Sequence, residues 1–318
     1  MKIPNYPSMV QFQQLVELKD CRPRTQSEYL RYVRKLAEHC QCDPALLSEA
    51  QVRDYFLFLR QHKHYAAAPM KLAKVALRSF YRDTIKVQGW TVFEELKIRE
   101  PEILPVVLSR QEVQRVLAAV HEIRFQACLR LMYHCGLRVG EAVSLEVRDL
   151  HDSRTDHPRL HVRQAKGGRD RFVPLTPGMV AELRQFWSTH ANPTFLFPSP
   201  GRFWADRSLS LSQMMQRATQ PMSVSSVQLA FKLARIQSGI NPSASPHTLR
   251  HSYATHLLEE GVSLLQISRY LGHHSLDTTV IYAHLTSVSE ARTLAALNTL
   301  HQALGPPAPG PNGQTIRR

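Results

Sequence analysis

Residues 245–284 constrain the chain most, because they have the pattern of three short helices with polar residues at their starts and glycines at their ends. Ser245 followed by Pro246 is typical of a helix start, and Gly261 is typical of a helix end. A second helix is predicted between residues 263 and 272, and a third follows it. The stretch therefore predicts a compact group of helix termini.

Four chemically active side chains fall at these termini. His247 and Arg250 lie three residues apart near the first helix start, so they share one face of that helix. His273 directly follows the second helix, and Tyr282 lies on the third. The spacing thus predicts that two histidines, an arginine and a tyrosine lie close together.

The composition indicates a two-domain protein that binds a polyanion. The 318 residues are too many for most single cores. Forty Lys and Arg against 26 Asp and Glu give a net charge of +14, which favours double-stranded DNA as the partner. We expect no membrane span, because no sufficiently long apolar run occurs. Five cysteines and no signal-peptide pattern favour free thiols in the cytoplasm.

Residues 1–88 are predicted to form a helical, DNA-gripping domain. Apolar residues recur at helical spacing over 9–18, 25–40, 48–60 and 66–85. Residues 89–108 lose this period and contain Pro101 and Pro105, so we expect them to be the interdomain linker.

Residues 109–302 are predicted to form a second, mainly α domain with a small antiparallel β-hairpin sheet. Two short strands are expected within 159–175 around a Gly-Gly turn, with Lys166 at the mouth of the turn. A further short strand is expected at 194–199. Helices are expected at 109–120, 125–136, 142–150, 178–190, 225–239 and 288–302. Residues 303–318 have the composition of a disordered tail.

These residues could together perform phosphodiester chemistry. Two arginines can hold the non-bridging oxygens of a phosphate while negative charge builds on them. A tyrosine can attack the phosphorus, and a lysine can protonate the leaving oxygen. No acidic cluster suggests a metal ion, so we expect neither metal nor cofactor. A phosphotyrosyl link would conserve the bond energy, so rejoining would need no ATP.

Two segments carry a specific resemblance. GLRVGEAVSLEVRDL and HTLRHSYATHLLEEG…LGHHSLDTTVIYAH resemble the two sequence boxes of the tyrosine recombinases of the phage-integrase family. The layout over residues 9–302 is most similar to Xer-type and transposon-associated integrases. The resemblance implies a 3′-phosphotyrosyl intermediate and a helical core-binding domain before the catalytic domain. Glu141 is expected to have a supporting role.

The resemblance also assigns six catalytic residues. It implies a phosphate clamp of Arg138 and Arg250, a general acid Lys166, an assisting base His247, a phosphate ligand His273 and a nucleophile Tyr282. Three further arginines could compete with Lys166 for the same phosphates: Arg163, Arg169 and Arg171. Four histidines match no catalytic position and are assigned to packing or backbone contacts: His251, His256, His274 and His284.

Several alternatives stay open at this point. Family analogy implies a tetrameric synapse on two DNA sites, in which helix 288–302 either packs in the core or docks onto a neighbouring protomer. A type IB topoisomerase and an inactive DNA-binding accessory protein are the rival functions. Integron integrases carry an inserted helix before the second box, and the segment from TFLFPS to SPHTLRH, residues 194–251, shows no counterpart.

Overall fold

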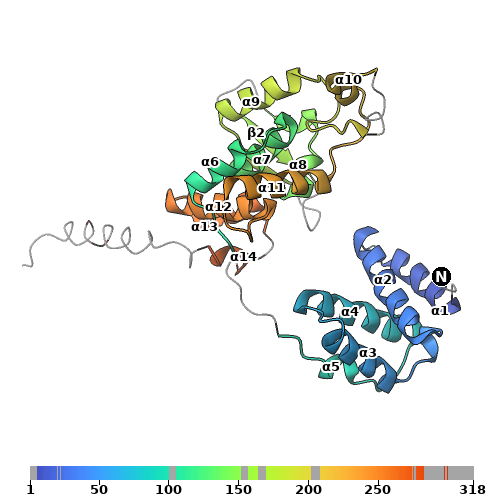
Figure 1. The fold of residues 1–318 in the computed structure, drawn as a ribbon. Coiled ribbons are helices and arrows are strands. Elements are labelled where there is room, and N and C mark those ends of the chain that lie inside the picture. Colours follow the sequence, from blue (N-terminus) through green and yellow to red (C-terminus); the bar gives the residue numbers. More distant parts are fainter. Residues whose placement is uncertain are drawn as a thin grey trace, which may run out of the picture. The chain divides into compact units, whose positions relative to one another are not determined.

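The computed structural model divides the chain into two compact units, Met1–Ile103 and Leu104–Arg318, which are considered separately (Figure 1). It describes residues 6–19, 21, 23–99, 105–151, 157–163, 170–201, 208–273, 275, 277–282, 297 and 299. Lys166, the tail 303–318 and nearly all of the predicted helix 288–302 lie outside these residues.

The first unit is a helical bundle, as predicted. Its elements are α1 (Pro7–Leu18), α2 (Pro23–Cys40), η1 (Pro44–Leu46), α3 (Glu49–Gln61), α4 (Ala67–Ser79), η2 (Phe80–Ile85) and α5 (Val92–Glu95). Phe12, Leu36 and Phe80 are fully buried between the helices. The fourth predicted helix changes at Phe80 into a π-helical turn, and Lys86 ends this turn in the left-handed conformation.

Part of the predicted linker packs into the first unit. Val92 and Phe93 are buried in its core, and the rings of Trp90 and Tyr81 lie 4.5 Å apart between centroids. The predicted limits at 88 and 109 therefore differ from the division after Ile103. The four-residue helix α5 is too short to show a helical period in the sequence.

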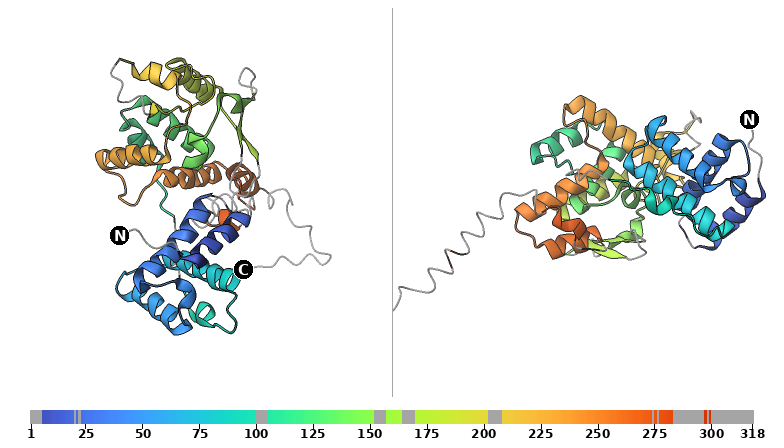
Figure 2. Two further views of the ribbon diagram at one scale, coloured as in Figure 1. Left: turned by 90° about the vertical axis from the view of Figure 1, so that its right-hand side faces the viewer. Right: turned by 90° about the horizontal axis from the view of Figure 1, so that it is seen from below.

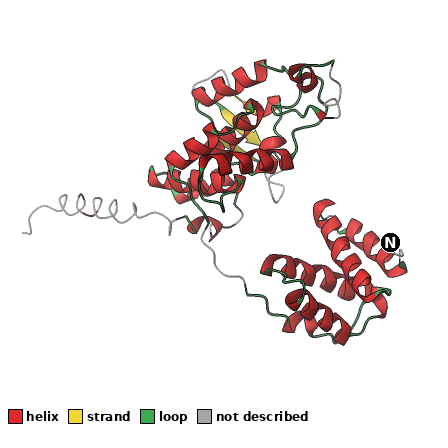
Figure 3. Cartoon of the chain, in the orientation of Figure 1, coloured by secondary structure: helices red, strands yellow, loops and turns green. Residues whose placement is uncertain are grey.

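The second unit is mainly helical with one small antiparallel sheet (Figures 2 and 3). The helices are α6 (Arg110–Ala118), α7 (Ile123–Cys135), α8 (Val139–Val143), η3 (Val147–Asp149), α9 (Pro177–Ser188), α10 (Leu211–Gln216), α11 (Val224–Ser238), α12 (Pro246–Glu259), α13 (Leu264–Leu271) and α14 (Asp277–Val280). Helix α12 is buried on most of its surface and packs against α7, α11 and α13. It is thus the central element of this unit.

The sheet has the order β1-β2-β3, formed by β1 (Leu150–His151), β2 (Arg159–Val162) and β3 (Arg171–Pro174). Leu160 lies opposite Val173, and both side chains are fully buried on the inner face. The hairpin prediction is confirmed for β2 and β3, and β3 contacts α13.

Two predicted elements are wrong. The helix expected over 142–150 ends at Val143, and the rest of this range forms the short turn η3 and then strand β1, in which Leu150 pairs with Leu160. The strand expected at 194–199 forms only isolated bridges, from Phe195 to Glu146 and from Pro198 to Pro221. A proline has no backbone N–H to donate to a ladder, so Pro198 disfavours a continuous strand here. Among the described residues, no helix is both long and apolar enough to cross a membrane.

Candidate active site

The site is built where α7, α8, α12 and α13 begin or end. Gly136 ends α7 in the left-handed conformation with φ +61°, and Arg138 is the N-cap residue of α8 two positions later. A Cβ atom at residue 136 would lie 2.4 Å from Cδ1 of Tyr253, so only glycine fits there. This sharp turn brings Arg138 to the start of α12.

Arg250 is the most deeply buried charged side chain in the site, with 1% of its surface exposed. It donates from Nη1 to the carbonyl oxygen of Gly136 and from Nη2 to that of Leu271, both at 2.7 Å. Burial, helped by the charge of Arg138, lowers the pKa of Arg250 to about 9. The guanidinium therefore stays charged at neutral pH and joins α12 to the ends of α7 and α13.

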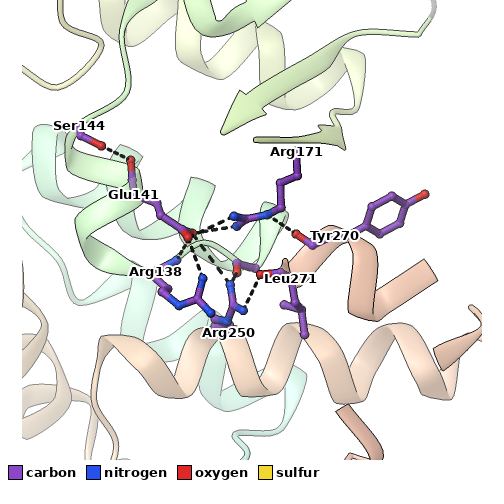
Figure 4. Close-up of polar contacts among 8 residues, drawn as sticks. Arg138, Glu141, Ser144, Arg171, Arg250, Tyr270 and Leu271 are labelled. Carbon is purple, nitrogen blue, oxygen red and sulfur yellow. Dashed lines mark hydrogen bonds and ion pairs between the residues drawn. The ribbon is translucent and has the colours of Figure 1, made fainter. Parts of the chain in front are cut away.

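Glu141 is the counterion of an arginine cluster (Figure 4). Its Oε1 accepts from Nη1 of Arg138 at 2.8 Å, and Arg171 donates to Oε1 at 3.1 Å and to Oε2 at 2.8 Å. Nη1 of Arg250 lies 3.9 Å from Oε2. Burial alone would raise the pKa of Glu141, but the hydrogen bond and charge of Arg171 lower it to about 2. The carboxylate is therefore ionised at neutral pH.

Tyr282 is 2% exposed and lies in the turn that follows α14, two residues after Val280, so the prediction that it lies on the third helix is wrong. Its hydroxyl is 3.0 Å from Nδ1 of His251, and its ring is nearly parallel to that of His273, with centroids 6.5 Å apart. Burial raises the pKa of Tyr282, whereas the positive charges of Arg250 and Arg138 act in the opposite direction. The two arginine charges thus partly offset the effect of burial on the Tyr282 hydroxyl.

His251 and His273 lie beside this tyrosine and His247 packs against His251, and burial lowers the pKa of all three. The rings of His247 and His251 are perpendicular, with centroids 4.8 Å apart. Nδ1 of His273 lies 2.7 Å from Oγ1 of the buried Thr279. Burial lowers the pKa of His247, and it lowers the pKa of His251 and of His273 to about 4. All three are therefore neutral at pH 7 and can accept a hydrogen bond.

The structure brings together five of the six predicted catalytic residues: Arg138, His247, Arg250, His273 and Tyr282. Lys166 lies outside the described residues, so its position stays a prediction.

The assignment of His251 to packing or backbone contacts needs correction, because its ring reaches the hydroxyl of Tyr282. The assignment of His256 is confirmed, since its buried ring packs against Tyr133 and hydrogen-bonds the backbone of Leu108, although it also reaches the Tyr133 hydroxyl. His251 contacts Tyr282, and Nδ1 of His256 lies 2.8 Å from Oη of Tyr133. The sequence held a signal for His251, since it follows His247 by four residues and shares its helix face.

The expectation that Arg171 competes for phosphates is wrong. For Arg163, which keeps 30% of its side chain exposed, the expectation stays a prediction, and Arg169 lies outside the described residues. Arg163 pairs with Asp149 at 2.7 Å and with Glu146 at 3.2 Å, whereas Arg171 pairs with Glu141. Side chains along β3 alternate between the buried and the exposed face of the sheet, and Arg171 lies on the buried face together with Val173.

Comparison with known proteins agrees with this architecture. Residues 106–288 match the phage integrase family, and residues 9–89 match the phage integrase N-terminal SAM-like domain. The putative integrase/recombinase y4qK of Sinorhizobium fredii (strain NBRC 101917 / NGR234) is 32% identical over 297 residues, which cover 93% of this chain and 89% of that protein. Tyrosine recombinase XerD of Shewanella oneidensis is 31% identical over 277 residues, covering 80% of this chain and 81% of its own.

Solved structures share the fold. A lambda integrase dimer bound to a COC′ core site matches with a TM-score of 0.67 at 18% identity, over 86% of this chain and 93% of that one. A lambda integrase tetramer bound to a Holliday junction matches with the same TM-score of 0.67 and the same 18% identity, over 86% of this chain and 76% of that one. The relatives are integrases and recombinases, so the topoisomerase and accessory-protein alternatives are not favoured. The chain therefore belongs to the phage integrase family and is a site-specific tyrosine recombinase, an enzyme that cleaves and rejoins DNA strands.

Proposed function

We propose that Tyr282 is the nucleophile of this recombinase and that Arg138 and Arg250 hold the scissile phosphate. Attack by Oη of Tyr282 on phosphorus would form a 3′-phosphotyrosyl bond and release a 5′ hydroxyl. The observation that carries this proposal is the charged Arg250, fixed by two backbone carbonyls beside a buried tyrosine.

The two arginines are suited to different parts of this task. Arg250 is held rigidly, and only two of its five N–H groups donate to the carbonyls of Gly136 and Leu271. Arg138 is more accessible, with 26% of its side chain exposed, and can meet the incoming DNA. Paired N–H donors stabilise the charge that builds on the non-bridging oxygens in the transition state.

The histidines and Lys166 would position the nucleophile, contact the phosphate and transfer protons. We assign His251 to holding the Tyr282 hydroxyl before attack, with His247 as the assisting base. His273 would contact the phosphate through Nε2, because its Nδ1 is already engaged with Thr279. Lys166 would protonate the leaving 5′ oxygen, so the proton lost by the tyrosine is matched by one delivered to the leaving group.

We further propose that the recombinase acts on duplex DNA as a tetrameric synapse, with helix 288–302 docking onto a neighbouring protomer. The net charge of +14 and the DNA-bound dimer and tetramer of lambda integrase support this assembly. Five unpaired cysteines support a reducing compartment such as the cytoplasm.

The nucleophile assignment is tested by trapping the covalent intermediate. Sequencing the DNA that the purified protein binds and cleaves first identifies a target site. A nicked duplex of that site then prevents rejoining, so that the adduct accumulates and is measured on a denaturing gel. Tyr282→Phe is expected to abolish the adduct, whereas Tyr133→Phe, which removes another histidine-bonded hydroxyl, is expected to retain it. An undiminished adduct in Tyr282→Phe would refute the assignment.

A further inference from the structure

We infer that Arg171 is a positioning residue for the phosphate clamp, which it serves by holding Glu141 and the end of α13 in place. The inference rests on the proposed function, in which Arg138 and Arg250 bind the scissile phosphate. It concerns an arginine that does not itself reach DNA.

The contacts of Arg171 use its whole guanidinium group. Nε donates to the carbonyl oxygen of Tyr270 at 2.6 Å, while Nη1 and Nη2 donate to the two carboxylate oxygens of Glu141 (Figure 4). Only 7% of the side chain is exposed. A guanidinium that is buried and engaged at all three nitrogens fixes its neighbours and is not available to bind a phosphate.

Arg171 and Arg250 bind consecutive carbonyls at the end of α13, those of Tyr270 and Leu271. The next residue, Gly272, turns the chain with φ +66°, and a Cβ atom there would lie 3.0 Å from Cδ of Arg171. The arginine side chain therefore packs against the turn that leads into His273. Removing Arg171 would remove one of the two arginine hydrogen bonds that hold the end of α13 before this turn.

Arg171 also controls how much positive charge faces the phosphate. Glu141 is shared by three arginines, which leaves the cluster a net charge of +2. Without Arg171 the net charge falls to +1, and the freed carboxylate oxygens can pair more closely with Arg138 and Arg250. A neutralised clamp binds less well the extra negative charge of the transition state.

The experiment measures the rate of adduct formation at saturating nicked DNA, together with DNA affinity and thermal unfolding. Arg171→Gln is expected to slow the adduct by about 10- to 100-fold, less than the loss of a direct oxyanion donor, which costs about 100- to 1,000-fold. DNA affinity should stay within about threefold, because Arg171 makes no proposed DNA contact. Arg163→Gln, which removes a carboxylate-paired arginine at the end of β2, is the matched control and should change the rate by less than about threefold.

A second substrate separates positioning of the clamp from a general loss of structure. In a methylphosphonate linkage, a neutral methyl group replaces one charged oxygen of the scissile phosphate. The penalty of Arg171→Gln relative to the parent enzyme should shrink to less than about threefold on this linkage, because less negative charge needs the clamp. An equal penalty on both linkages would refute the inference, as would a rate within threefold of the parent on the normal phosphate.

Two further arms cover the remaining outcomes. If Arg171→Gln does not fold, Arg171→Lys carries the same comparison, since it keeps the charge but cannot bind both carboxylate oxygens and the carbonyl together. A rate penalty of Arg171→Lys that is smaller on the methylphosphonate than on the normal phosphate would then support the inference, and an equal penalty on both would refute it. Absence of any adduct in the parent enzyme would overturn the proposed function and this inference together, whereas an active parent with an equally active Arg171→Gln would overturn the inference alone.

Discussion

Replacing Glu141 by glutamine should destabilise the second unit in a way that depends on pH. Burial would raise the pKa of Glu141, but the hydrogen bonds and charges of the arginines, chiefly Arg171, lower it from 4.5 to about 2, which corresponds to about 3 kcal/mol of folding free energy. Because the folded-state pKa lies below the unfolded one, this contribution is complete above about pH 4.5. It is lost as the pH falls from 4.5 towards 2. Glu141→Gln should therefore cost about 3 kcal/mol at pH 7 and progressively less in acid.

The measurement is urea unfolding at pH 7 and at pH 3.5, followed by circular dichroism, with the free energy taken from the transition of the second unit. Glu182→Gln is the matched control, because Glu182 forms two hydrogen bonds with Arg130 while both side chains are 44% exposed. A surface pair of this kind contributes about 0 to 1 kcal/mol. The contrast between the two glutamine variants isolates the effect of burial.

Two results would contradict this reasoning. A loss at pH 7 as small as that of Glu182→Gln would mean that burial does not strengthen the arginine cluster. A loss that is equal at pH 7 and pH 3.5 would mean that the ionisation of Glu141 does not carry the effect, leaving lost packing as its cause.

Three other predictions concern a turn, a histidine and the DNA. Gly136→Ala should cost several kcal/mol in thermal unfolding because of the contact with Tyr253, whereas Gly140→Ala, with open space around it, should be nearly neutral. The pKa of His251 is lowered from 6.5 to about 4 by burial, so the unfolded chain binds the proton first. The free energy of unfolding should therefore fall as the pH falls from 6.5 to 4, by at most about 3 kcal/mol, and it should fall less in His251→Gln. If the free energy of unfolding depended on pH equally in the parent and in His251→Gln, this prediction would be contradicted. DNA affinity should fall by orders of magnitude between about 50 and 200 mM salt, as measured by fluorescence anisotropy, and a flat response would contradict phosphate binding.

The sequence by itself determined the features that depend on near neighbours. Capping residues and glycines act within one helical turn, so Ser245 and Gly272 marked helix ends correctly. The same local geometry placed His247 and Arg250 on one face of α12. The family resemblance then supplied the expected nucleophile, and the comparisons confirm the family.

Only the tertiary structure decided the features that depend on distant contacts. Leu150 became a strand residue because Leu160 lies beside it, overriding the local helical pattern. Arg171 became the partner of Glu141, and His251 became the partner of Tyr282, across 30 and 31 residues of sequence. Charge and residue type show which groups can interact. Which of several arginines or histidines does so depends on burial and direction, which are fixed only when the helices and the sheet pack together.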